Sequence, residues 1–244
     1  MPFPRFSQTT DITALATRLE GSPLTDVLRW AWDSFGSKAA IGTSFQGAGL
    51  VIIDHAVRAG LPLPVFTLDT GLLFPETQDL KDKLEAFWGI SIEALKPPRT
   101  VGEQAVDQGP ELWTRLPDLC CYLRKVVPLQ EKLASLDVWI TGLRRGGGET
   151  RSNTGIIEAY QFDPLQDSMI YKLNPLAAWE KSAVWDYIRE RGIPYNPLHD
   201  QGYRSIGCYT CTKPAGEDTD ERAGRWTGFD KAECGIHTFL PMAK

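Results

Sequence analysis

The chain has 244 residues, of which 42% are hydrophobic and 10% aromatic, and it carries a formal net charge of −5. This composition excludes fibrous and disordered proteins and indicates one globular α/β domain with an appended C-terminal segment. No apolar run approaches the roughly 20 residues that span a bilayer, and the N-terminus lacks the basic-then-apolar order of a signal peptide. We therefore expect a cytoplasmic protein with no membrane partner and, because it is acidic, no nucleic-acid partner.

The first hundred residues alternate between helical and extended patterns. Apolar residues recur at helical spacing in several stretches that end at a glycine, and short apolar runs between turn residues indicate strands. We expect helices over 11–21, 23–36, 50–60 and 75–89, strands over 38–41, 63–69 and 90–97, and a small-residue loop over 42–49. The alternation predicts an α/β fold with a mostly parallel, twisted sheet and helices on both faces.

The second half of the chain begins with a polar stretch over 101–113. After it we expect helices over 121–136 and 178–192, and strands over 137–143, 154–163 and 168–176. From residue 193 onward the chain is rich in glycine, proline and charge, and it has few periodic signals. We therefore divide the chain into an α/β domain, residues 1–200, and a loop-rich C-terminal segment, residues 201–244.

Three loops follow expected strands, at the edge where open α/β sheets bind ligands. They read "GTSFQGAG" (42–49), "LDTGLLFPET" (68–77) and "TGLRRGGGETR" (141–151). In the first, backbone N–H groups and the hydroxyls of Thr43 and Ser44 are suited to an anion. It is not a Walker A loop, because no Gly-Lys-Ser/Thr follows. An ordinary tight turn between strand and helix is the alternative.

Arginines cluster in this otherwise acidic chain. Arg144, Arg145 and Arg151 lie around three glycines and offer planar, bidentate donors for phosphate or sulfate. A second island, "ERAGRW", covers 221–226. Such islands favour a small anionic ligand over a polyanion, and solvated surface arginines are the alternative.

Four of the five cysteines form two close pairs, Cys120 with Cys121 and Cys208 with Cys211. Four thiolates suit tetrahedral zinc or an iron–sulfur cluster. Adjacent side chains on a helix diverge by about 100°, which favours the wider cluster over a single ion. Lys125, four residues after Cys121, would lie on the same helical face and offset thiolate charge, unless it faces solvent. Cys234 is left over.

The motifs together resemble the family of assimilatory adenylyl-sulfate (APS) reductases and their phosphoadenylyl-sulfate (PAPS) reductase relatives, which have an adenine nucleotide alpha hydrolase-like fold. The resemblance covers roughly residues 40 to 238. It is carried, in the family's order, by "TSFQGAG", "LDTGLLFPET", "CCYLRK", "TGLRRGGGETR", "GCYTC" and "ECGIHT".

This resemblance implies a role for each motif. A 4Fe-4S cluster would be held by Cys120, Cys121, Cys208 and Cys211, with Lys125 between it and the sulfate end of the substrate. Cys234 would be the nucleophile, and Arg151, Arg222 and Arg225 would bind the anionic substrate. The adenosine site would be lined by the first loop, which contains Thr43, Ser44 and Gly47, and by Leu68, Asp69 and Thr70.

The implied reaction is thioredoxin-dependent reduction of adenosine 5'-phosphosulfate to sulfite and AMP, for cysteine biosynthesis. A thiolate attacks the sulfur and forms an S-sulfocysteine, and a second thiol then releases sulfite. With four cysteines on the cluster, the second thiol must come from a partner, thioredoxin or glutaredoxin. His237, three residues after Cys234, would either favour the thiolate or be an exposed tail residue. We also expect a homo-oligomer.

Three alternatives remain. A PAPS reductase is the nearest, although members that use PAPS commonly lack the four cluster cysteines. An iron–sulfur tRNA-thiolating enzyme would carry an SGGxDS loop, which is absent here, and net acidity disfavours tRNA. A zinc-stabilised binding module would contain zinc and no iron.

Overall fold

The structure is a computed structural model that describes residues 11–163, 168–217, 220–231 and 233–237. Residues 1–10, at the start of the N-terminal stretch considered for a signal peptide, lie outside the described residues. So do Thr238 of the last motif and the remainder of the 201–244 segment beyond it. Within the described part of the chain, none of the helices combines the length and the apolar character needed to cross a membrane.

Six strands form one sheet in the order β3-β2-β1-β4-β6-β5. Their bounds are β1 (Ala39–Thr43), β2 (Val65–Leu68), β3 (Ile92–Leu95), β4 (Val138–Ile140), β5 (Ile157–Asp163) and β6 (Ser168–Leu173). Every neighbouring pair is parallel except β5 and β6, which form an antiparallel edge. The prediction of a mostly parallel sheet is confirmed.

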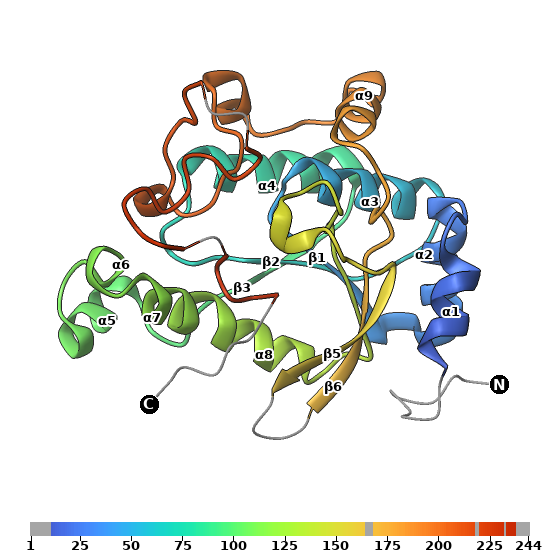
Figure 1. Ribbon diagram of the computed structural model, residues 1–244, viewed down its shortest axis with the longest axis horizontal. Coiled ribbons are helices and arrows are strands. Elements are labelled where there is room, and N and C mark those ends of the chain that lie inside the picture. Colours follow the sequence, from blue (N-terminus) through green and yellow to red (C-terminus); the bar gives the residue numbers. More distant parts are fainter. Residues whose placement is uncertain (1–10, 164–167, 218–219, 232, 238–244) are drawn as a thin grey trace.

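Helices cover both faces of this sheet (Figure 1). They are α1 (Ile12–Leu19), α2 (Leu24–Phe35), α3 (Gly47–Arg58), α4 (Pro75–Trp88), α5 (Val101–Gln108), α6 (Leu112–Arg115), α7 (Pro117–Cys121), α8 (Val127–Leu133) and α9 (Lys181–Arg191). In Figure 1, α3, α4 and α9 lie on one side of the strands and α5 to α8 on the other. The elements expected from the alternating pattern are therefore present.

Successive strand residues point to opposite faces, and this alternation builds two cores. On β4, Ile140 packs into the core beneath α2, α3 and α9, whereas Trp139 packs against α8. On β2, Val65 packs into the first of these cores and Phe66 into the second. All four side chains are at most 7% exposed. The two cores hold the sheet in place, and its carboxyl edge stays open for a site.

Two segments differ from the sequence-based expectation. Most of the polar stretch 101–113 is helical, in α5 and the start of α6. Thr100 and Glu103 form a capping box at the start of α5, with N–H···O distances of 3.2 and 2.7 Å. The helix expected from residue 121 begins at Pro117 and contains a π-helical turn over Tyr122–Val126. Pro128 has no N–H to continue a regular helix, and the Val127 N–H bonds to the Tyr122 carbonyl in the wider register.

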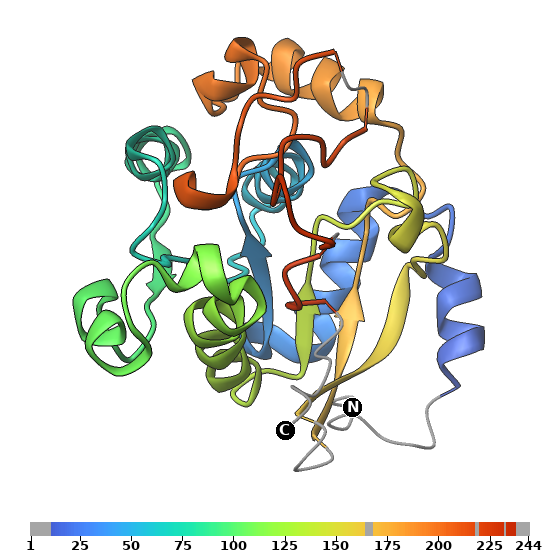
Figure 2. The same ribbon diagram turned by 60° about the vertical axis from the view of Figure 1, so that its left-hand side comes forward.

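The chain after α9 crosses the carboxyl edge of the sheet with little regular structure. It contains short 3₁₀ turns at Pro197–Gln201 and Tyr209–Cys211 and is tied to the α/β body by a β-bridge between Leu73 and Cys208. Figure 2 shows its last part, in red, running between α7 and α8 on one side and β5 and β6 on the other. The C-terminal segment therefore closes over the edge where ligands bind in such folds.

Candidate active site

A cavity of about 260 Å³ lies at the carboxyl ends of β1, β2 and β4 and beneath the C-terminal segment. It has the concave, enclosed character of a small-molecule site. The predicted site residues that line it are Thr43, Ser44, Gly47, Leu68, Thr70, Lys125, Arg144, Arg151, Cys208, Arg222, Arg225, Cys234 and His237. Residues separated by almost 200 positions in the sequence thus share one cavity.

The first loop turns sharply from β1 into α3. The Thr43 hydroxyl accepts a hydrogen bond from the Phe45 N–H at 3.0 Å, and Phe45 takes a positive φ of 57°, which non-glycine residues rarely adopt. A Cβ at Gly49 would lie 2.4 Å from the Thr43 hydroxyl, so this close approach requires glycine. The turn aims the N-terminus of α3, which begins at Gly47, into the cavity, where its N–H groups favour an anion.

The loop after β2 lines the cavity and also contacts one of the cysteines. The Thr70 hydroxyl lies 3.3 Å from the Cys208 sulfur, and the Arg124 guanidinium donates to the Thr70 carbonyl. Asp69 does not line the cavity. Its carboxylate accepts from the Gly71 N–H at 3.0 Å, so it shapes the turn.

Four thiols gather beside the cavity, and none is in a disulfide. Cys120, Cys121 and Cys208 are each 6% exposed and Cys211 is half-buried. Burial, with negative charge on the other three thiols as the next cause, raises the pKa of the Cys120 thiol to about 12. That influence places the other three thiols within electrostatic reach of Cys120. Among the residues that the structure describes, no group of three or more His, Cys, Asp or Glu side chains is arranged to hold a single metal ion.

Lys125, in the π-helical turn, lies between these thiols and the cavity. It is 9% exposed, so the solvent-facing alternative is wrong. Burial lowers the pKa of its ammonium, but negative charge on Cys208, Cys121 and Cys234 more than compensates, and the pKa is raised overall. Lys125 is therefore a fixed positive charge shared by the thiols and the cavity.

Cys234 lines the same cavity as this lysine. Burial alone would raise the pKa of its thiol, but Lys125, the Ile236 N–H and the guanidinium groups of Arg225 and Arg222 lower it below the usual value. A lowered thiol pKa increases the thiolate fraction, and the thiolate is the nucleophile. The geometry thus provides one activated thiol surrounded by cations.

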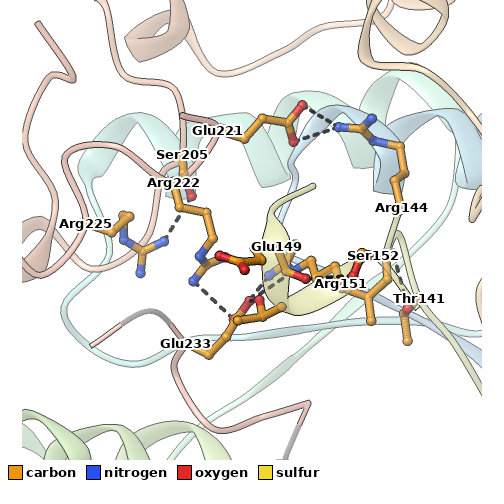
Figure 3. A network of polar contacts seen from close by, with 12 residues as sticks. Thr141, Arg144, Glu149, Arg151, Ser152, Ser205, Glu221, Arg222, Arg225 and Glu233 are labelled. Carbon is orange, nitrogen blue, oxygen red and sulfur yellow. Dashed lines mark hydrogen bonds and ion pairs between the residues drawn. The ribbon is translucent and has the colours of Figure 1, made fainter. Parts of the chain in front are cut away.

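Three of the cavity arginines are paired with two glutamates of the C-terminal segment (Figure 3). Arg144 forms a bidentate pair with Glu221, with both distances 2.8 Å. Arg151 binds Glu233 at 2.9 and 3.2 Å, and Arg222 binds the same carboxylate at 3.2 Å. Burial lowers the pKa of Arg222 to about 10, with repulsion from Arg151 as the next cause. Glu233 therefore offsets the positive charge of two half-buried arginines.

Ser205 and Trp226 hold the Arg225 side chain in place. It donates to the Ser205 hydroxyl at 3.2 Å and lies over the Trp226 ring at 4.4 Å. A Cβ at Gly207 would come within 2.3 Å of its guanidinium, so glycine leaves the space in which Arg225 reaches the cavity. This restraint aims its charge at Cys234.

Arg145 and His237 do not have the positions expected for them. The sequence predicts that Arg145 binds the anion, and that His237 favours the Cys234 thiolate or is exposed. Arg145 points away from the cavity and forms a pair with Glu20, which directly follows α1, with both distances 2.9 Å. His237 stacks on Trp139, with ring centroids 5.1 Å apart and planes 13° apart. Burial, with help from Lys172, keeps the pKa of His237 well below its usual value. His237 is therefore a neutral, packed side chain and does not supply a positive charge.

Several residues at the site were missed in the sequence analysis. Glu233 precedes Cys234, but a single glutamate gives no signal of its partners. Trp139 and Lys172 follow from no motif, although a lysine within the apolar run "MIYKL" is an unusual choice for a buried strand. Lys172 is in fact only 4% exposed.

Comparison with known proteins identifies the family of the chain. Residues 38–214, more than half of it, match the phosphoadenosine phosphosulfate reductase domain. The chain belongs to the phosphoadenosine phosphosulfate reductase family. It is 42% identical to an adenosine 5'-phosphosulfate reductase of Salinibacter ruber, over 94% of this chain and 89% of that protein. A Streptomyces coelicolor protein of the same name is also 42% identical, over 94% and 96% of the two chains.

Comparison with solved structures supports the same family and fold. The crystal structure of a phosphoadenylyl-sulfate reductase from Candida auris superposes with a TM-score of 0.73 at 32% identity, over 87% of this chain and 100% of that one. An FMN adenylyltransferase of Candida glabrata gives a TM-score of 0.58 at 13% identity, which is a likeness of fold alone. The resemblance inferred from the motifs and the predicted fold class are both confirmed.

Proposed function

We propose that the protein reduces adenosine 5'-phosphosulfate to sulfite and AMP in sulfate assimilation, with Cys234 as the nucleophile. The observation that carries this proposal is the position of the Cys234 thiol, in a cavity at the carboxyl edge of the sheet and within reach of three cationic groups. The relatives named adenosine 5'-phosphosulfate reductase, which align with most of the chain, support the choice of substrate.

The substrate's two ends match two parts of the cavity. The nucleoside would lie against the first loop, Thr43 to Gly47, and Leu68, while the phosphosulfate would face Lys125 and the arginines of the C-terminal segment. Guanidinium groups bind such oxyanions bidentately. Asp69 and Arg145 do not reach the cavity, so we leave them out of the binding site.

In the first step, the Cys234 thiolate forms a bond to the sulfur of the sulfate group. The bond between that sulfur and the bridging oxygen breaks, and its electron pair leaves with AMP. Lys125, Arg222 and Arg225 offset the negative charge that thiolate and substrate bring together. The product is an S-sulfocysteine at position 234.

In the second step, a thiolate of a dithiol protein attacks the Cys234 sulfur. The sulfur–sulfur bond to the sulfo group breaks, sulfite leaves with the electron pair, and a mixed disulfide remains. The second thiol of the partner then forms the partner's own disulfide and restores Cys234 as a thiol. The two electrons come from the partner, which we take to be a cytoplasmic thioredoxin or glutaredoxin.

The four remaining cysteines fit a 4Fe-4S cluster by the chemistry of their donor set. Three buried thiols and one half-buried thiol, all free of disulfides, lie together, with the other three within electrostatic reach of Cys120, and the Thr70 hydroxyl supports one of the sulfurs. A bound cluster would supply iron to neutralise these thiolates and a fixed charge beside Lys125. Neither step above draws electrons from it.

A second candidate substrate, phosphoadenylyl sulfate, is favoured by the name of the Candida auris structure. The deciding experiment measures sulfite release from each nucleotide with thioredoxin as reductant and compares kcat/KM. We expect adenosine 5'-phosphosulfate to be preferred by at least tenfold, which is about 1.4 kcal/mol in transition-state binding. A preference for phosphoadenylyl sulfate would overturn the assignment of substrate.

A further inference from the structure

Three side chains from adjacent strands form a small aromatic platform on the α8 face of the sheet. Trp139 lies on β4, Tyr160 on β5 and Lys172 on β6. The Lys172 ammonium is 4.6 Å from the centroid of the Tyr160 ring and 5.8 Å from a Trp139 ring centroid. It also pairs with Glu158 at 3.7 Å. The cation and the two rings thus hold one another in a fixed arrangement.

The platform contacts the tail that carries the nucleophile. The Tyr160 hydroxyl donates to the Ile236 carbonyl at 2.8 Å, and the His237 ring stacks on Trp139. The Ile236 side chain packs against the same core as both aromatic residues. Residues 236 and 237 are therefore docked by one hydrogen bond, one ring stack and apolar contact.

Cys234 lies two residues before these contacts. Gly235 between them takes a φ of +82°, a conformation that favours glycine and turns the chain back toward the cavity. On the other side of Cys234, Glu233 binds Arg151 and Arg222. The nucleophile is held between an ionic anchor and the aromatic platform.

We propose that Trp139 and Tyr160 are positioning residues for Cys234: by docking residues 236 and 237, the aromatic platform places the thiol against the cavity cations. Undocking releases Cys234 toward a reductant. The contacts described for residues 236 and 237 are a hydrogen bond between neutral groups, a ring stack and apolar packing, so docking is reversible, as the second step of the reaction requires. The inference rests on the proposed function only in naming Cys234 as the nucleophile.

The test measures how fast iodoacetamide alkylates Cys234 in the substrate-free holoprotein, with the modified peptide quantified by mass spectrometry. Because the docked thiol is half-buried among the cavity side chains, alkylation is faster in the undocked state, and its rate rises with the population of that state. Tyr160→Phe keeps the ring and removes only the hydrogen bond. We expect about a fivefold faster reaction, equivalent to about 1 kcal/mol, the worth of one hydrogen bond.

Two further variants examine the stacking contact. Trp139→Leu removes the ring under His237 and should accelerate alkylation at least as much, whereas Trp139→Phe restores part of the protection. Trypsin cleavage after Lys231, at the start of the tail, should accelerate in the same order. If Trp139→Leu fails to fold, Tyr160→Phe still decides the question.

Tyr187→Phe is the matched control, because Tyr187 lies on α9 and its hydroxyl donates to Asp54 of α3 at 2.7 Å, and neither helix carries the nucleophile. Its alkylation rate should equal that of the wild type. Unchanged protection of Cys234 in Tyr160→Phe, or an equal rise in Tyr187→Phe, would overturn the proposal. These measurements need no turnover, so the expected pattern in a protein that releases no sulfite would reject the proposed function and leave the docking role standing.

Discussion

Glu233 occupies the arginines that the substrate's anion would need. Its carboxylate contacts Arg151 at 2.9 and 3.2 Å and Arg222 at 3.2 Å, and it is itself 14% exposed. An incoming phosphosulfate must therefore displace it. We predict that Glu233→Gln, which keeps the size of the side chain and removes its charge, strengthens binding of the substrate.

The magnitude follows from the contacts that are lost. A hydrogen bond to a charged group contributes about 1.5–3 kcal/mol. The glutamine still offers one acceptor oxygen. We therefore expect the interaction of residue 233 with Arg151 and Arg222 to weaken by about 2 kcal/mol, which corresponds to about thirtyfold in an equilibrium constant. We expect adenosine 5'-phosphosulfate to bind about tenfold to thirtyfold more tightly.

Isothermal titration calorimetry in a Cys234→Ser background, where no turnover occurs, measures this difference. Glu20→Gln is the matched control, because Glu20 also forms a two-point pair with an arginine, Arg145, but outside the cavity. Its effect on binding should stay within about twofold, as for exposed ion pairs in general. Unchanged or weaker binding in Glu233→Gln would refute the claim that glutamate and substrate share the same arginines.

Three other predictions concern the thiols and the arginines. Cys234→Ser should release no sulfite while retaining about four irons per chain and an unchanged visible spectrum; loss of iron in this variant would assign Cys234 to the cluster. The rate of Cys234 alkylation should level off at a lower pH than for a free thiol of pKa about 8.5, because the lowered pKa keeps the thiolate at lower pH. Lys125→Met should move that plateau to higher pH, and an unchanged profile would remove Lys125 from the activation of the thiol. Arg222→Ala should lower kcat/KM on the order of a hundredfold and Arg145→Ala less than twofold, and equal losses would contradict the placement of the two arginines.

The fold class followed from the alternation of strand and helix patterns along the chain. That pattern depends on local periodicity, which the sequence contains in full. The strand order β3-β2-β1-β4-β6-β5 depends on which edges pair in space, and no local signal specifies it. The helices within 101–113 had a local signal, the Thr100 and Glu103 capping box, but their polar composition obscured it.

The site, like the fold, has a part that the sequence predicts and a part that it does not. Cysteines and arginines are rare enough to be noticed in pairs, and they make up six of the 13 predicted residues that line the cavity. Arg144 and Arg145 illustrate the limit, because adjacent residues of one loop point in different directions: one pairs with Glu221 in the cavity and the other with Glu20 outside it. The aromatic platform is drawn from three strands, so only the sheet brings its members together.

The most direct test of the account looks for the covalent intermediate. The reduced holoprotein would be mixed with adenosine 5'-phosphosulfate in the absence of any dithiol, digested and mapped by mass spectrometry. The account predicts the added mass of one SO₃ group on the peptide that carries Cys234, and its release as sulfite when thioredoxin is added. An adduct on any other cysteine, or AMP release with no adduct on Cys234, would contradict it.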